Sequence, residues 1–347
     1  MMHNAHTPPA SSTDTTAPAA PAPQHQRSQR LSARLLRAAG DLLARRAAAN
    51  GRLCIINYHR ILEAADPLLE SDPDVATFRW QMQVLADCFN VLSLPAAMAA
   101  LAAGTLPPRA VCITFDDGYR STHDLALPVL QQFGLPATVF VATGFVSEGS
   151  NMWNDRILEA VRNLRAPHLD LSAFGLGSFD IDSVAARVAA IPRLTEQAKY
   201  LAPAARQALI EHLDALADIG THALMVTDDM IRALAAHNIE IGAHTISHPI
   251  LTKLSDDAAM YEMAESKREL ETILGREVRY FAYPNGKEGM DFDHRHVAMA
   301  REAGFAAAFT TAIGAASRHD DLYALPRSRP WDATPAMFAL RLLRWLA

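Results

Sequence analysis

Two short polar motifs, each directly after an apolar run, carry residue types that can bind a metal ion and move a proton. The first is Asp116-Asp117-Gly118, which follows the run at residues 110–115. The second spans residues 244–249, follows the run at residues 239–243 and holds two histidines four residues apart. Strand ends are where α/β folds place their sites, so we expect the two motifs to meet at one edge of a sheet.

The histidine pair, His244 and His248, has the spacing of metal ligands. Two imidazoles and one carboxylate leave coordination positions open, as a catalytic metal site requires. Pro249 disfavours the α conformation at His248, which separates the pair from helical zinc motifs. Alone, the Asp-Asp-Gly motif fits a solvated turn equally well. Since both motifs occur on separate strands, the sequence favours a metal site in which one aspartate is a ligand and the other faces the space beside it.

The elements that must position these residues are buried strands joined by helices. Helical patterns fill the gaps between the strands; one begins at Ser255 as N-cap and ends at Gly275. Such an alternation predicts a parallel β/α architecture. The predicted strands are residues 53–57, 110–115, 137–142, 239–243, 278–282, 306–309 and 322–325.

Between the third and fourth predicted strands lie about 95 residues rich in Ala, Leu and Arg, too many for a simple connection. We expect an inserted helical subdomain at about residues 150–237. Trp153 opens this insertion. Its ring could form an aromatic wall for a sugar or belong to the core of the subdomain, and the sequence does not favour either.

Composition excludes several classes of protein. Half of the residues are hydrophobic and the net charge is -6, so the chain lacks the basic excess of a nucleic-acid binder. Its three cysteines, Cys54, Cys88 and Cys112, are too few and too widely spaced for a disulfide framework or a cysteine-rich zinc site. No run is long and apolar enough to span a membrane. We expect no nucleic-acid partner.

The two ends of the chain have patterns of their own. Residues 1–30 are rich in Ala, Pro, Ser and Thr, which predicts a disordered leader without the features of a secretory signal and favours the cytoplasm. Residues 31–50 form a basic amphipathic pattern, and residues 332–347 a second amphipathic one. Each helix could pack on the barrel, the interpretation that we favour, or lie on an anionic membrane surface at its inner face.

The motifs Thr114-Phe115-Asp116-Asp117-Gly118 and HxxxHP at residues 244–249 together resemble those of the NodB-homology polysaccharide deacetylases, carbohydrate esterase family 4. The resemblance covers about residues 51–331, with the insertion outside it. It implies a distorted (β/α)7 barrel and one divalent metal ion, zinc in the first place and otherwise cobalt, nickel or iron. Carried over by position, Asp116 is the general base, and the ligands are Asp117, His244 and His248.

A third segment, Phe281 to Gly286, resembles the family's FRPPYG motif but departs from it at three positions. Ala282 stands where the family has an arginine that orients the base. Asn285 stands where the family has a tyrosine whose backbone N–H helps to bind the oxyanion, a role that does not depend on the side chain. Tyr283 is expected beside it on the substrate side. Arg327, at the end of the last predicted strand, is the natural substitute for the missing arginine.

The histidine acid of the family, in a late LxH motif, has no counterpart here. The first predicted strand instead ends in Asn57-Tyr58-His59. Because a barrel closes, its first and last strands are neighbours, so His59 could occupy the place of that acid. This resembles the permuted biofilm-polysaccharide deacetylases, in which a Tyr-His segment precedes TFDDG. We therefore expect His59 as general acid, with a structural histidine as the alternative.

The function that these residues and the resemblance imply is metal-dependent hydrolysis of N-acetyl groups on a carbohydrate. The partner would be an N-acetylated glycan, and a cytoplasmic location would point to a precursor or lipid-linked glycan met at the inner membrane face. Two alternatives stay open. One is a metal-dependent amidohydrolase or O-acetyl esterase on another substrate, and the other is a degenerate carbohydrate-binding barrel, suggested by the missing arginine.

Overall fold

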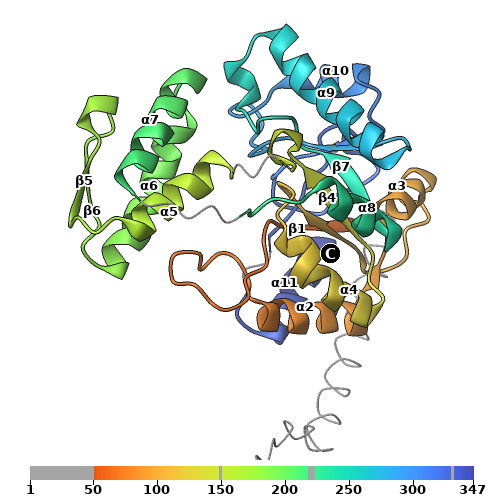
Figure 1. Cartoon of the computed structure of the whole chain (residues 1–347). Helices are drawn as coiled ribbons and strands as arrows, with labels where there is room; N and C mark the ends of the chain where they lie inside the picture. The colour runs from red at the N-terminus through yellow and green to blue at the C-terminus, as the bar shows by residue number, and fades with distance from the viewer. Residues whose placement is uncertain (1–50, 148–150, 218–222, 330–331) are drawn as a thin grey trace, which may run out of the picture.

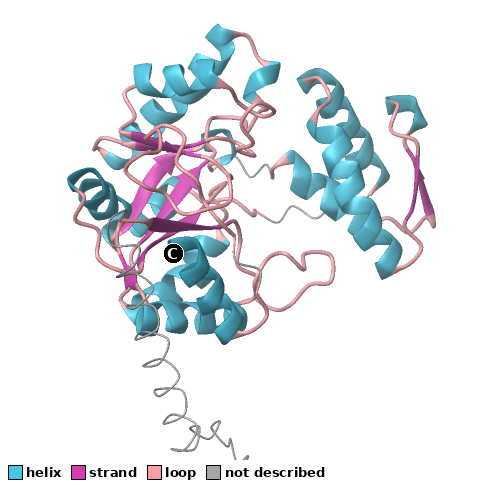
Figure 2. Cartoon of the chain, turned by 180° about the vertical axis from the view of Figure 1, so that it is seen from behind, coloured by secondary structure: helices cyan, strands magenta, loops and turns pink. Residues whose placement is uncertain are grey.

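The core of the fold is a curled sheet of parallel strands (Figures 1 and 2). The computed structural model describes residues 51–147, 151–217, 223–329 and 332–347. The strands of the sheet are β1 Leu53–Tyr58, β2 Asn90–Val91, β3 Ala110–Phe115, β4 Ala137–Val141, β7 Ile239–Ala243, β8 Tyr280–Ala282 and β9 Ala307–Phe309. They run in the order β1-β3-β4-β7-β8-β9, with the short β2 beside the start of β3. The predicted parallel β/α architecture is therefore confirmed.

The segment after β9 joins the last strand back to the first. Leu325 forms a parallel bridge to β9, and Ser328 forms one to β1. The sequence predicts a regular strand at residues 322–325, but the structure has only these isolated bridges in this region. Residues 322–324 form a turn in which the N–H of Ala324 donates to the carbonyl of Asp321, so only Leu325 of this segment forms a bridge to β9. The bridges close the curl of the sheet into the distorted barrel that was expected.

Side chains along these strands point alternately into the barrel and toward the surrounding helices. The interior is apolar over most of its depth and includes Ile55, Cys112, Phe140 and Ala282. The neighbouring residue Phe281 belongs instead to the outer core beneath the helices. This alternation decides which side chains beyond the strand ends face the mouth of the barrel.

Helices cover the outside of the barrel and the N-terminal ends of its strands. Helix α3, at Leu94–Ala103, packs against the side chains of the barrel interior, so it covers those N-terminal ends. Helix α9 begins at the N-cap Ser255 and ends at Gly275, whose φ is 66°, as predicted. The helices around the barrel are α2 Val75–Cys88, α3 Leu94–Ala103, α4 Leu127–Phe133, α8 Asp228–Ala236, α9 Asp256–Leu274, α10 His294–Glu302 and α11 Pro335–Leu346.

Helix α11 packs on the barrel with one face and leaves the other to solvent. Phe338 and Leu342 belong to the outer core, whereas Met337 and Leu340 are exposed. Among the helices of the described residues, none combines the length and the apolar character that crossing a membrane demands. The predicted leader at 1–30 and the predicted basic helix at 31–50 lie outside the described residues.

The insertion forms a unit beside the barrel, with a hydrophobic core of its own (Figure 1). Its elements are α5 Trp153–Asn163, β5 His168–Asp170, β6 Ser178–Asp180, α6 Val184–Lys199 and α7 Pro203–Leu216. The antiparallel β5–β6 hairpin was not predicted, because strands of three residues are too short to show a period. Helix α8 falls within the predicted limits of 150–237 but packs in the outer core of the barrel through Ile231 and Leu234.

Candidate active site

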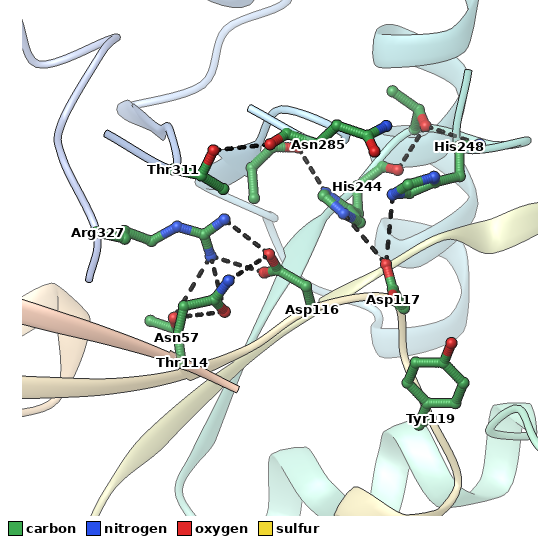
Figure 3. A network of polar contacts seen from close by, with 12 residues as sticks. Asn57, Thr114, Asp116, Asp117, Tyr119, His244, His248, Asn285, Thr311 and Arg327 are labelled. Atoms are coloured by element: carbon green, nitrogen blue, oxygen red, sulfur yellow. Dashed lines mark hydrogen bonds and ion pairs between the residues drawn. The ribbon is translucent and has the colours of Figure 1, made fainter. Parts of the chain in front are cut away.

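The two aspartates lie at the C-terminal end of β3, where the chain turns. Asp116 continues the alternation of β3 and points into the mouth of the barrel, as Figure 3 shows. Asp117 has a φ of 73° and Gly118 a φ of 86°, so the backbone reverses here. A Cβ on Gly118 would lie 3.0 Å from Cγ1 of Val141, which explains why glycine occupies this turn. The reversal turns the carboxylate of Asp117 away from that of Asp116.

The two histidines follow β7, the strand that lies two places from β3 in the sheet. Nδ1 of His244 lies 2.7 Å from the carbonyl oxygen of Ala282. A carbonyl can only accept a hydrogen bond, so Nδ1 carries the proton and Nε2 presents its lone pair. That Nε2 faces Asp117 (Figure 3). Such a second contact is what orients a ligand histidine in metal sites.

The backbone between the two histidines is held in a strained form. Thr245 has a φ of 65° and His248 a φ of 53°. Positive φ angles are unusual for residues other than glycine and asparagine. The hydroxyl of Thr245 donates to the carbonyl of His244 and accepts from the backbone N–H of His248. Glu262 of α9 accepts from the N–H groups of Ile246 and Ser247 at 2.8 and 2.9 Å. These bonds fix the loop that carries both imidazoles.

Asp117, His244 and His248 form a donor set that fits one divalent metal ion. One ligand atom from each lies within 4.8 Å of the other two. Oδ1 of Asp117 lies 3.4 Å from Nε2 of each histidine, and within the described ranges this buried oxygen accepts no hydrogen bond. A buried carboxylate oxygen without a donor is costly unless a cation neutralises it. Two imidazoles and one carboxylate are ligands typical of zinc and neighbouring transition metals.

The charges around these three side chains favour a cation between them. Burial lowers the pKa of His248 to about 4, so its ring is neutral near neutral pH. Burial also lowers the pKa of His244, but Asp116 and Asp117 outweigh it and leave the pKa above its ordinary value. Burial raises the pKa of Asp117, and the nearby histidines more than reverse this, so the carboxylate is ionised. A negative oxygen beside two imidazoles attracts a cation.

Asp116 forms a buried bidentate ion pair with Arg327. Nη1 of Arg327 lies 2.6 Å from Oδ1 and Nη2 lies 2.7 Å from Oδ2. Asn57 donates a third hydrogen bond to Oδ2 at 2.9 Å. Both charged side chains are almost fully buried. Burial raises the pKa of Asp116, but the arginine and neighbouring histidines hold it below its ordinary value, so the carboxylate is ready to accept a proton.

Arg327 is itself held by the barrel wall. Its Nε donates to the carbonyl of Thr310 at 3.0 Å, and its guanidinium carbon lies 5.3 Å above the ring of Phe140. Like Leu325 two residues earlier, it points into the barrel interior, the side that Ala282 also faces. An arginine at position 282, as in the family pattern, and Arg327 would thus both point into the interior, from neighbouring parts of the barrel wall. The structure brings together Asp116 and Arg327 as the sequence suggested.

His59 follows β1 at the same mouth. Its Nδ1 is buried and has no hydrogen-bond partner within the part of the chain that the structure describes. Burial and the positive charge of Arg329 lower the pKa of His59, while Asp117 and Asp116 oppose the shift. Because β1 pairs with β3 and Tyr58 lies opposite Phe115, His59 and Asp116 each come directly after neighbouring strand ends. Its role as the general acid stays a prediction.

Asn285 is held at the mouth by the segment that follows β9. Thr311 donates from its hydroxyl to the carbonyl of Asn285 at 2.7 Å. Asn285 has a φ of 60°, and Gly286 has a φ of 70°. A Cβ on Gly286 would lie 2.8 Å from the backbone nitrogen of Thr311, so only glycine fits. Figure 3 shows the side chain of Asn285 on the side of the two ligand histidines.

Tyr283 is a correction to the sequence analysis. It was expected on the substrate side, but its side chain is fully buried in the outer core. Its ring stacks on Phe292 with centroids 4.0 Å apart, and its hydroxyl donates to the carbonyl of Tyr323 at 2.9 Å. Alternation explains the error, because Ala282 faces the interior and the next residue must therefore face outward.

Tyr283→Phe tests this correction. The variant should keep full activity and lose about 1 kcal/mol of stability, since it removes one hydrogen bond and little packing. Thermal unfolding and the rate of acetate release measure the two quantities on the same sample. An activity loss of an order of magnitude at unchanged stability would return Tyr283 to the substrate side.

Trp153 lies at the start of α5 and packs against the core of the insertion. The guanidinium of Arg206 lies 5.0 Å above its ring. These contacts match the alternative of a place in the subdomain core. A role for Trp153 as a wall for a sugar stays a prediction without a contact to support it.

Several residues at the site were not identified from the sequence. Asn57 had a signal, because the alternation of β1 places it inward at a strand end, beside Asp116. No pattern in the sequence pointed to Glu262 or Thr245, since their contacts depend on tertiary structure. No local pattern identified Asp155 in the insertion either. Its buried carboxylate pairs with Arg60 at 2.6 Å and accepts a hydrogen bond from the hydroxyl of Tyr119 at 3.0 Å.

The chain is similar to known proteins in sequence and in fold. The chain is 24% identical over 221 residues to the Bacillus subtilis protein YxkH, to which a polysaccharide deacetylase activity is ascribed. The match covers 64% of this chain and 51% of YxkH, so the chain spans about half the length of that relative.

Solved structures share the fold. The Streptococcus pyogenes deacetylase PplD, in complex with acetate, superposes with a TM-score of 0.56 at 21% identity, covering 85% of this chain and 98% of PplD. IcaB from Ammonifex degensii gives a TM-score of 0.56 at 19% identity, covering 85% of this chain and 97% of IcaB. Residues 103–308 match the polysaccharide deacetylase family. This chain therefore belongs to the polysaccharide deacetylase family, whose members hydrolyse N-acetyl groups on carbohydrates.

Proposed function

We propose that this protein hydrolyses an N-acetyl group on a carbohydrate with the aid of one divalent metal ion, for which zinc is the first candidate. Asp117, His244 and His248 would hold the ion. When bound, such an ion polarises a carbonyl group and makes water acidic enough to lose a proton near neutral pH. The observation that carries the proposal is the ion-paired carboxylate of Asp116 at the same edge of the sheet as Asp117, His244 and His248.

Asp116 would accept the proton of the attacking water. Arg327 and Asn57 direct three hydrogen bonds to its two oxygens, which keeps it ionised and fixes its orientation. The pair keeps the carboxylate ionised and immobile, so it can accept a proton from a water held beside it. Arg327 thereby supplies the guanidinium that Ala282 lacks. Its presence supports an active enzyme over a degenerate binding module.

His59 would protonate the departing sugar amine, because an amine anion is a poor leaving group. His59 comes directly after β1, beside the strand that carries the aspartates, and it keeps an unpaired buried nitrogen among the described residues. A backbone N–H at Asn285 would stabilise the negative charge on the acetyl oxygen. The products are acetate and a free amine. The substrate would be an N-acetylated glycan or its precursor.

Metal analysis coupled to acetate release tests the proposal. The purified protein should contain about one zinc or similar ion and release acetate from at least one of a panel of N-acetylated saccharides. Chelation should abolish release, and returning the metal should restore it. Metal at 100 times its Kd should also stabilise the fold by about 2.7 kcal/mol, which thermal unfolding detects. Metal without acetate release from any acetylated saccharide would count against an enzyme of this class.

A further inference from the structure

The side chain of Asn285 presents a donor that the fold leaves unused. Its Nδ2 is buried and makes no hydrogen bond to any of the described residues. An unpaired buried amide is unfavourable, and native proteins keep few of them. Buried atoms of Asp117, His59 and His248 at the same mouth are also unpaired among the residues of the described ranges. Four of the buried atoms without a hydrogen-bond partner among the described residues thus belong to side chains at this mouth, where a substrate would bind.

Hydrogen bonds fix the backbone that carries this amide. Asparagine tolerates the left-handed conformation at position 285 better than most residues. The hydroxyl of Thr311 binds its carbonyl at 2.7 Å, and the backbone N–H of Thr311 binds the carbonyl of Gly286 at 3.0 Å. The backbone from which the amide projects is thus fixed, so the donor has a defined starting point at the mouth.

The chemistry of the neighbouring groups indicates what the amide would meet. Ala282, three residues before Asn285, holds His244 through its carbonyl, so the loop bearing Asn285 starts at the ligand shell. Figure 3 shows the amide directed to the side of His244 and His248. An acetamido group brings a carbonyl oxygen that can only accept hydrogen bonds. During attack this oxygen gains negative charge, and an N–H donor gains strength with it.

We propose that Nδ2 of Asn285 donates a hydrogen bond to the carbonyl oxygen of the scissile N-acetyl group and stabilises the charge that develops on it. The inference rests on the proposed function and goes beyond the backbone donor of this segment. Asn285 is then a catalytic residue through its side chain, at a position where the family pattern has tyrosine.

Two substitutions distinguish the contribution of the Asn285 side chain from that of its backbone N–H. Asn285→Gly keeps the left-handed conformation and the backbone N–H but removes the amide. Asn285→Asp keeps the size of the side chain and its tolerance of this conformation but cannot donate. Asn238→Gly is the matched control, because Asn238 has a φ of 61°, is exposed and precedes β7 at the end opposite to His244.

The assay is acetate release from a chitooligosaccharide by the metal-loaded full chain, with kcat and KM measured separately. Both Asn285 variants should lose about 10²–10³ in kcat, with little change in KM and unchanged metal content. The control should match the wild type. In parallel, a methylphosphonamidate analogue of the acetamido group, which carries the oxyanion's charge, should bind Asn285→Gly more weakly by a similar factor.

A kcat within threefold of the wild type in Asn285→Gly would overturn the inference, whatever happens to KM. The same holds if the analogue binds that variant as tightly as it binds the wild type. Either result leaves the proposed function intact as long as the wild type releases acetate. Failure of the metal-loaded wild type to release acetate from any acetylated saccharide is the separate result that contradicts the proposed function itself.

Discussion

Asp116→Asn is expected to abolish acetate release while the protein keeps its metal. The amide cannot take a proton from water, so turnover should fall by about 10²–10⁴. The change also leaves Arg327 as an unpaired buried cation, so stability should fall by about 3–5 kcal/mol. Acetate release, metal content and thermal unfolding measured on one preparation separate these effects.

Asp117→Asn is the matched comparison for this result. It lies one residue away and is equally buried, but it should lose metal affinity as well as turnover, because it removes the charged ligand. The assignment of the two aspartates fails if Asp116→Asn loses its metal, or if it turns over at a rate close to that of the wild type.

The second large effect is expected for Arg327→Met. The variant leaves the Asp116 carboxylate buried without its cation, which should cost about 3–5 kcal/mol of stability. The base would also lose its fixed orientation, and a shift of about 1 Å can reduce the rate about 10²-fold. Arg276→Met is the control, since Arg276 is an exposed arginine in a loose pair with Glu240. That change should alter stability by no more than about 0.5 kcal/mol.

A second substitution distinguishes loss of the orientation of Asp116 from a general loss of stability. Adding Ala282→Arg to Arg327→Met places an arginine where the family pattern has one, on the interior side of the neighbouring wall. The double variant should regain both stability and turnover relative to Arg327→Met alone. If it regains stability but no turnover, Arg327 serves the fold rather than the base.

The meeting of the two aspartates and the two histidines could be predicted from the sequence because parallel strands share one edge. Asp116, Asp117, His244 and His248 each follow an apolar run, and the carboxyl ends of such runs must meet. The same reasoning placed Arg327 near Asp116, since closure makes the last segment a neighbour of the first. It did not reveal that the arginine would bind both carboxylate oxygens.

The remaining features could not be predicted for identifiable reasons. Tyr283 was misplaced because it was assigned by its motif and not by the alternation that Ala282 imposes. The loop bonds of Glu262 depend on how α9 docks, which no local pattern encodes. The hairpin β5–β6 has three-residue strands with polar ends, below the length at which periodicity is informative.

The closure of the barrel has a consequence for the synthesis of the protein. The segment that matches the family, residues 103–308, contains the three ligands and Asp116, but not Arg327, Asn57 or His59. Nη1 of Arg327 reaches the side chain of Asn57 across 270 positions of sequence. Domains begin to fold from the N-terminal side while the ribosome still works. The nascent chain can therefore bring Asp117, His244 and His248 together before residue 327 is made, yet the carboxylate of Asp116 gains its bidentate partner only once Arg327 has folded into the barrel wall.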